Sequence, residues 1–229
     1  MSGCGHLLTA AGTAMLVGLL VQPIFAQNAP ELTDLRGHSM EAAAIKNLVS
    51  QGVMSPTAPG KFDPEVTMKR GDFAVALQRL FDLPQPSKPM KFSDVREGDA
   101  IYAAVQAVAP FMDKQVPCPG CELGSKFEPA KSVSRGVWAV TLVRILVLQN
   151  KLQLANVAQT DATLANVPDA REIPKRARPY VATAIQSGVM DCCAGNALEL
   201  SQLIGRADIA EMLNKVQEQF KIPLAKAGA

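Results

Sequence analysis

Apolar residues recur at helical spacing in six stretches of this chain, and the stretches come in pairs. In the first pair, this spacing predicts one helix that ends near Gly52 and a second that runs to Phe81. Gly52 favours the left-handed conformation that ends many helices, and Thr67 is a candidate N-cap for the second helix. The apolar positions are Ala42, Ala43, Ile45, Leu48 and Val49, then Phe73, Val75, Ala76, Leu77, Leu80 and Phe81.

The second and third pairs follow the same plan. The second pair is predicted near residues 100–108 and from Ser134 to Leu146, and Pro110 ends or kinks its first helix because proline lacks an amide donor. Residues 83–91 contain three prolines, which predicts a stiff linker. Residues 149–163 are predicted to be a longer polar connector. Residues 61–62, 126–127 and 197–198 are candidate short β segments. We therefore expect six main helices joined by ordered loops.

Each pair is embedded in a motif that occurs three times in the same order. The opening segments are Leu32–Leu35, Phe92–Val95 and Leu164–Val167. The middle segments are Phe62–Pro64, Phe127–Pro129 and Leu198–Leu200. An arginine then opens each second helix, and these are Arg70, Arg135 and Arg206. A unit of this size cannot bury its own apolar face, so the copies must pack on one another.

These motifs resemble the S-layer homology repeat over roughly residues 32–219. The resemblance implies a mainly α fold, in which three helix-loop-helix repeats pack as a pseudo-threefold domain. The repeats would span residues 32–83, 92–150 and 164–219, followed by a tail at residues 220–229. Each motif is short, but three copies in the same order make the pattern specific.

The resemblance also implies a function. Such domains attach secreted proteins non-covalently to cell-wall polymers, so the implied partner is cell-wall glycan: peptidoglycan or an attached acidic polymer. Envelope proteins are a second class of partner. The family's arginine contacts an acidic sugar group, which carries over to Arg70, Arg135 and Arg206. A guanidinium is suited to this role because its forked donors match a carboxylate.

A second interpretation of the same arginines is structural. An arginine at a helix start can tie neighbouring repeats together through carbonyls or a carboxylate. The protein would then be a structural or protein-interaction module of the periplasm or envelope, without glycan binding. The sequence also departs from the family pattern, with His38-Ser39 where a His-Trp pair is frequent and Val137 where an acid is usual. The identity of the sugar and the number of working grooves therefore stay open.

Composition narrows the class of protein. The 229 residues suffice for one compact domain and an export segment, and 48% hydrophobic with 19% charged residues indicates a globular chain. The formal charge is +2 without a basic run, which argues against nucleic acid as a partner. Neither a phosphate-binding glycine loop nor a nucleophile motif occurs, so we expect no enzyme activity, no cofactor and no metal site.

The N-terminus predicts export. Residues 7–26 contain no charged side chain, and a plausible cleavage region precedes Gln27. This pattern favours a signal peptide at residues 1–26 and a location in the periplasm, cell wall or outer envelope. The alternative is an uncleaved anchor, because roughly 20 apolar residues can span a bilayer.

Four cysteines follow the predicted signal peptide: Cys118, Cys121, Cys192 and Cys193. An even number of cysteines in an exported chain favours disulfides, and the sequence leaves the pairing open. Two other interpretations are a redox C-x-x-C at residues 118–121 and a zinc site made of four thiolates.

A cluster of cations lies near the first helix of the third pair. It consists of Arg171, Lys175, Arg176 and Arg178. Such a run is usually a solvated face, and its functional alternative is a patch that faces an anionic glycan or membrane surface.

Overall fold

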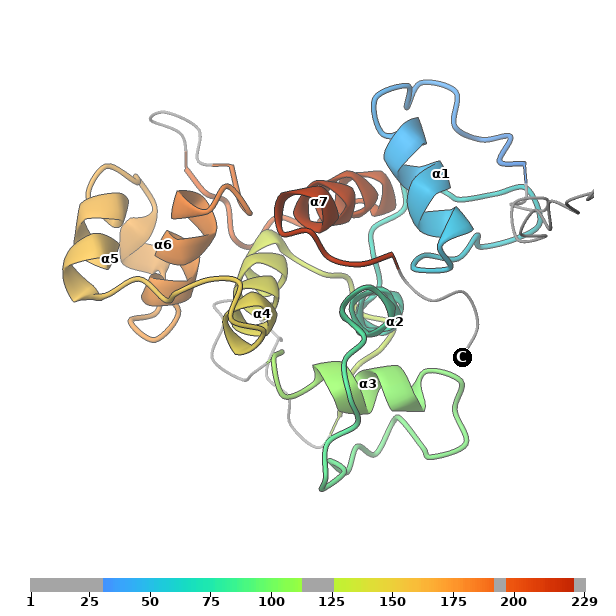
Figure 1. The fold of residues 1–229 in the computed structure, drawn as a ribbon, viewed down its shortest axis with the longest axis horizontal. Helices are drawn as coiled ribbons and strands as arrows, with labels where there is room; N and C mark the ends of the chain where they lie inside the picture. Colours follow the sequence, from blue (N-terminus) through green and yellow to red (C-terminus); the bar gives the residue numbers. More distant parts are fainter. Residues whose placement is uncertain (1–30, 113–125, 192–196, 225–229) are drawn as a thin grey trace, which may run out of the picture.

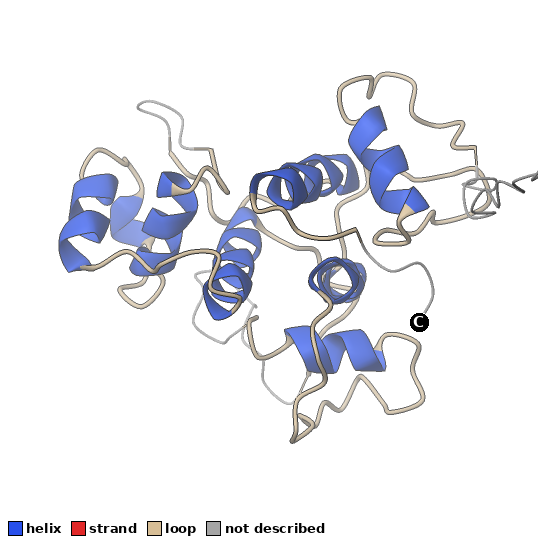
Figure 2. Ribbon diagram, in the orientation of Figure 1, coloured by secondary structure: helices blue, strands red, loops and turns tan. Residues whose placement is uncertain are grey.

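The computed structural model describes residues 31–112, 126–191 and 197–224 (Figure 1). Within these ranges the chain is helical and contains no strand (Figure 2), which confirms the mainly α prediction. The helices are α1 Ala42–Ser50, α2 Arg70–Phe81, α3 Tyr102–Val108, α4 Arg135–Leu148, α5 Val157–Leu164, α6 Arg178–Gln186 and α7 Arg206–Gln219, with a 3₁₀ turn, η2, at Ala170–Glu172. No helix in the described ranges is long and apolar enough to cross a membrane.

Helix α5 was not predicted, because all of it except Leu164 lies in the polar connector of residues 149–163. Its start is fixed by a capping box: the Asn156 side chain accepts from the Gln159 amide at 2.9 Å, and the Gln159 side chain accepts from the Asn156 amide at 2.9 Å. The expectation of six main helices was therefore one helix short.

Two local expectations also change. Helix α2 begins at Arg70 with Lys69 as its N-cap residue, and the hydroxyl of Thr67 instead lies 2.8 Å from that of Ser132. Of the three candidate β segments, only Lys61 takes part in a bridge, an isolated one with Ala58. The other bridges in the described ranges join segments that precede α2, α4 and α7.

The helices pair between motif copies. The second helix of each copy packs against the first helix of the next: α2 against α3, α4 against α6, and α7 against α1 (Figure 1). Helix α5 packs on α6. Each copy thereby covers an apolar face that its own two helices leave open.

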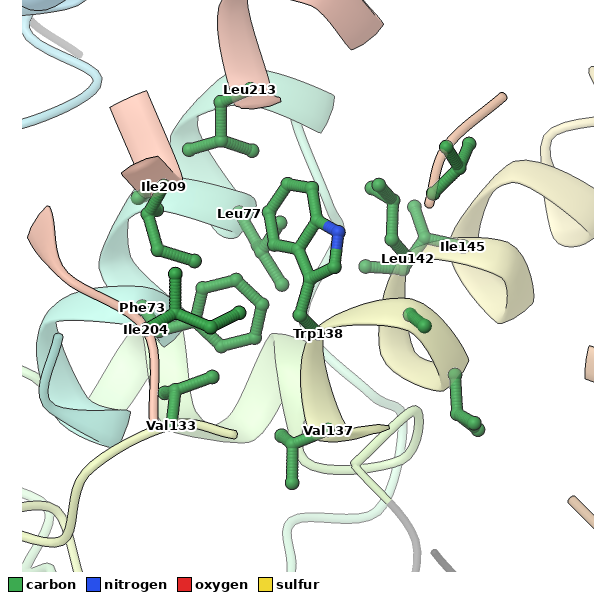
Figure 3. Packing of buried hydrophobic residues seen from close by; sticks show 14 of the residues in the cluster. Phe73, Leu77, Val133, Val137, Trp138, Leu142, Ile145, Ile204, Ile209 and Leu213 are labelled. Atoms are coloured by element: carbon green, nitrogen blue, oxygen red, sulfur yellow. The ribbon is translucent and has the colours of Figure 1, made fainter. Parts of the chain in front are cut away.

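The centre of the core lies where α2, α4 and α7 meet. The single tryptophan, Trp138 of α4, is fully buried, and its ring lies 5.8 Å from that of Phe73 of α2. Figure 3 shows Leu213 of α7 above the indole in this view. Aromatic side chains bury the most apolar area per residue, so this cluster makes a large contribution to the core.

Backbone hydrogen bonds close a triangle beside this core. Met68 donates its amide to the carbonyl of Ile204 at 2.9 Å, Ile204 donates to Val133 at 3.0 Å, and Val133 donates to Met68 at 2.8 Å. These residues precede α2, α7 and α4. The triangle therefore places the first turns of the three helices, and the arginines that open them, around one point.

Candidate functional site

Three aspartates hold the middle segments in place. Asp94 accepts from the amides of Phe127 at 2.8 Å and Glu128 at 2.7 Å. Asp34 makes the corresponding bonds to Phe62 and Asp63, and Asp169 makes them to Leu198 and Glu199. A carboxylate that accepts two backbone amides is a strong tie, because hydrogen bonds to charged groups exceed neutral ones.

This finding shifts the third opening segment. The expected opening at Leu164–Val167 places Asn166 beside Asp94 in the motif, but the hydrogen bonds place Asp169 there. The opening segment that corresponds to Phe92–Val95 is therefore Val167–Ala170. Helix α5 ends just before it.

The second residue of each middle segment has an unusual backbone conformation. Asp63, Glu128 and Glu199 have φ values of +53°, +58° and +50°. Side chains other than glycine adopt this left-handed region infrequently and at some cost. Each of these residues donates its amide to one of the three aspartates, which helps to offset that cost.

Each of the three arginines donates its backbone amide to a carbonyl two residues after the middle segment of the next copy. Arg70 and Arg135 donate their amides to the carbonyls of Lys131 and Gln202, both at 2.9 Å or less. Arg206 donates its amide to Val66 at 2.9 Å, so the third copy returns to the first. The contacts therefore run from the first copy to the second, from the second to the third, and from the third to the first.

The Arg206 side chain is occupied by protein groups. Its Nε donates to the Phe62 carbonyl at 2.8 Å and Nη2 donates to the Ser55 carbonyl at 2.8 Å. Nη1 lies 3.8 Å from a carboxylate oxygen of Asp72. Burial lowers the pKa of Arg206, and the charges of Asp72, Asp63 and Asp34 oppose that shift. The guanidinium thus ties α7 to the first copy.

Arg70 is buried more deeply, at 1% exposure, and its guanidinium lies over the Phe127 ring at 5.1 Å from the centroid. Its Nε has no hydrogen-bond partner among the residues that the structure describes. Burial lowers the pKa of Arg70, and the charges of Glu128 and Asp94 oppose that shift. A cation–π contact supplies part of the stabilisation that hydration would give.

Arg135 differs from the other two because it is only half-buried. Its Nε donates to the Leu198 carbonyl at 3.0 Å, and Nη2 makes a longer contact of 3.5 Å to the Asp191 carbonyl. The remaining donors of its fork are directed to neither carbonyl. Of the three arginines, Arg135 therefore has the most surface and donor capacity for an anion.

Sequence reasoning found the arginines and missed the aspartates. Asp34, Asp94 and Asp169 each precede a first helix, where an acidic residue is unremarkable, so only the fold reveals what they bind. The candidate disulfide residues Cys118, Cys121, Cys192 and Cys193 lie outside the described residues. Within the described residues, no group of three or more His, Cys, Asp or Glu side chains is placed to hold a metal ion.

Comparison with known proteins adds two findings. The family model of the S-layer homology domain matches residues 31–74, which include Asp34, α1 and the start of α2 with Arg70. The chain is also 26% identical over 215 residues to the surface-layer 125 kDa protein of Lysinibacillus sphaericus. That alignment covers 91% of this chain and 17% of the relative, so the chain corresponds to a small part of that protein. The resemblance seen in the sequence is thereby confirmed at residues 31–74, which match an S-layer homology domain.

Proposed function

We propose that this protein is exported and binds a cell-envelope glycan non-covalently through its S-layer homology fold. The observation that carries the proposal is the family match at residues 31–74. Resemblance to this family implies attachment to cell-wall polymers. The similarity to a surface-layer protein supports the same location. In this proposal the protein is a structural component of the cell surface and not an enzyme.

We extend the domain beyond the matched region to three repeats in a pseudo-threefold arrangement. Two sets of contacts support this extension. The aspartate that accepts two backbone amides occurs three times, at Asp34, Asp94 and Asp169. The contacts of the helix-opening arginines run in a closed order through the three copies.

The proposed glycan contacts are Arg70, Arg135 and Arg206, at the three junctions between copies. Arg135 is the leading contact because it is the least buried of the three and only its Nε makes a short hydrogen bond, to the Leu198 carbonyl. A forked guanidinium favours a carboxylate or a similar planar anion on the polymer. Arg206 is less suited to this role than Arg135, since it is only 4% exposed and its third nitrogen already lies 3.8 Å from the Asp72 carboxylate.

One observation favours a second function, a structural or protein-interaction module without glycan binding. Arg70 and Arg206 are 1% and 4% exposed and both lie over a phenylalanine of the next copy. In this version the arginines only join the copies. The two functions differ in one respect that can be measured, which is whether Arg135 contributes to glycan binding without contributing to folding.

The test is co-sedimentation of the purified protein with cell-wall sacculi. The variants are Arg135→Gln and Arg135→Lys, and the control is Arg36→Gln, which removes the same charge at an exposed loop position. We expect Arg135→Gln to weaken binding by about tenfold or more, since a hydrogen bond to a charged group is worth roughly 1.5–3 kcal/mol. Arg135→Lys should recover only part of the loss, because lysine has no fork.

Circular dichroism must first show that the variants are folded. Equal binding by the parent and Arg135→Gln would remove Arg135 from the site. An absence of binding by the folded parent would exclude glycan attachment for that wall and favour the protein-interaction module. The three-repeat arrangement is not affected by either result, because it rests on the contacts within the chain.

A further inference from the structure

A hollow of about 490 Å³ lies between the end of α5 and the start of α6. Its apolar lining consists of Leu164, Val167 and Ala170, which are all buried. Its charged lining consists of Asp161, Arg171 and Arg178. The volume falls within the range of small-molecule sites, which is roughly 300–1,000 Å³.

Two hydrogen bonds near this hollow hold α5, and the segment that precedes it, against α6. Gln186 of α6 donates to the hydroxyl of Thr163 on α5 at 2.6 Å. At the other end, the amide of Ala155 donates to the hydroxyl of Thr183 at 2.9 Å. Figure 1 shows α5 and α6 side by side at one end of the molecule. The site is therefore built from packed elements, and α5 exists here because the connector folds into a helix.

The hollow has an uncompensated positive charge. Among the residues that the structure describes, no ion pair is made by Arg171, Lys175, Arg176 or Arg178. Arg178 is held at the wall by a bond from Nη2 to the Ala170 carbonyl at 3.2 Å. Its Nε is buried and has no partner in the described residues. A buried donor without a partner is costly, and an anion that binds the more exposed part of this guanidinium would offset the cost of holding its charge here.

The lining combines the groups that recognise a sugar with an acidic substituent. Two guanidiniums provide forked donors for a carboxylate. Asp161 and Asn166 provide an acceptor and an amide for hydroxyl groups. Leu164, Val167 and Ala170 provide an apolar floor for the C–H face of a sugar ring. Two arginines against one aspartate leave one positive charge, which matches a ligand with a single negative charge.

We propose that the hollow between α5 and α6 binds one carboxylate-bearing sugar residue. This site shares none of its lining residues with the junction arginines Arg70, Arg135 and Arg206. The choice of a sugar as ligand rests on the proposed function. The placement of the site rests on the hollow, its two guanidiniums and the unpartnered Nε of Arg178.

The test is titration of the purified protein with N-acetylmuramic acid, followed by calorimetry or NMR. N-acetylglucosamine is the matched neutral probe, because the two sugars differ by the lactyl group that carries the carboxylate. We expect saturable binding of the acidic sugar and at least tenfold weaker binding of the neutral one. Sodium acetate is the third probe, and it should compete at least tenfold less well than the acidic sugar.

The variants are Arg171→Gln and Arg178→Lys, and Arg36→Gln is the control for loss of one exposed charge. We expect Arg171→Gln to weaken binding of the acidic sugar at least fivefold while the control is unchanged. Arg171 is exposed, so its variant should fold even if Arg178→Lys does not. The proposal is overturned by equal affinity for both sugars, by equal competition from acetate, or by wild-type affinity in Arg171→Gln.

Failure of this proposal is distinguishable from failure of the proposed function. If the parent protein sediments with sacculi but does not bind the soluble acidic sugar, the proposed sugar site in the hollow is overturned and the proposed glycan attachment stands. If the parent protein binds the soluble sugar through Arg171 but does not sediment with sacculi, the sugar site in the hollow is supported and attachment to that wall is overturned.

Discussion

The guanidinium of Arg206 lies over the ring of Phe62, with its Cζ 4.5 Å from the ring centroid, and its Nε donates to the carbonyl of the same residue. The two residues are 144 positions apart in the chain. One side chain thus contacts both the ring and the backbone of a residue in the first motif copy. This pair joins the last long helix to the start of the domain.

We expect Arg206→Ala to destabilise the fold strongly. The carbonyls of Phe62 and Ser55 lose their donors, and a buried polar group without a partner costs about 1–3 kcal/mol. The free energy of unfolding in urea measures the loss. Arg36→Ala is the matched control, and it should stay within about 0.5 kcal/mol of the parent because it is exposed. Equal urea midpoints for the two variants would contradict a structural role for Arg206.

Asp34 should make the free energy of unfolding depend on pH in the acidic range. Desolvation raises the pKa of its carboxyl, but the hydrogen bonds from the amides of Asp63 and Phe62 outweigh it, and the pKa is lowered below its ordinary 3.8. A group with a lowered folded pKa stabilises fully above its unfolded pKa, and the stabilisation is lost as the pH falls through the folded value. Stability should therefore decline below about pH 4.

The variant that isolates this effect is Asp34→Asn. It keeps the size of the side chain and removes its titration. We expect the variant to be less stable than the parent at neutral pH and to lose less stability between neutral pH and acid. Chemical unfolding at several pH values gives the slope of unfolding free energy against pH for the parent and for the variant. Parallel slopes would show that Asp34 has the same pKa in the folded and unfolded protein.

The side chains of Gln51 and Gln217 should be coupled. Their amides exchange two hydrogen bonds of 2.7 and 3.1 Å across the contact between α1 and α7, and both residues are buried. Gln217→Leu should cost about 1–3 kcal/mol, because it leaves the buried amide of Gln51 without that partner. Replacing both residues by Leu should cost less than the sum of the single changes, and a double-mutant cycle measures the difference. Strict additivity would refute the coupling.

Trp138 should be the largest single contributor to the core. It is fully buried against Phe73, and truncation of a buried tryptophan to alanine costs roughly 3–5 kcal/mol. Trp138→Phe should cost less, because the indole Nε1 has no hydrogen-bond partner in the described residues and the ring is largely retained. Circular dichroism is the readout, since both variants remove the fluorophore. A Trp138→Phe variant as unstable as Trp138→Ala would contradict this account.

The pattern of apolar residues predicted the paired helices because each has a face that must be buried. Ile45 and Leu48 of α1 and Leu77 and Leu80 of α2 are all buried, as their spacing requires. The missed helix α5 had a local signal, since Asn156 and Gln159 have the spacing of a capping box. Its eight residues contain few large apolar side chains, so periodicity alone could not identify it.

The roles of polar residues were harder to predict, because partners from distant segments decide them. Thr67 has the chemistry of an N-cap, yet its hydroxyl contacts Ser132 of the next copy. Arg70 and Arg135 occupy the same place in the motif, but one is fully buried and the other half-buried. Spacing along the chain gives the position of such a residue, while its exposure depends on how the next copy packs over it.

The contact between α1 and α7 also has a consequence for the order of folding. A ribosome makes α1 well before α7, so α1 lacks this packing partner until α7 has been synthesised. The hydrogen bonds between the side-chain amides of Gln51 and Gln217 likewise form only after both residues have been synthesised. Distant contacts of this kind slow folding, because a long loop must close before they form. A nascent chain therefore completes the packing of α1 only after α7 has left the ribosome.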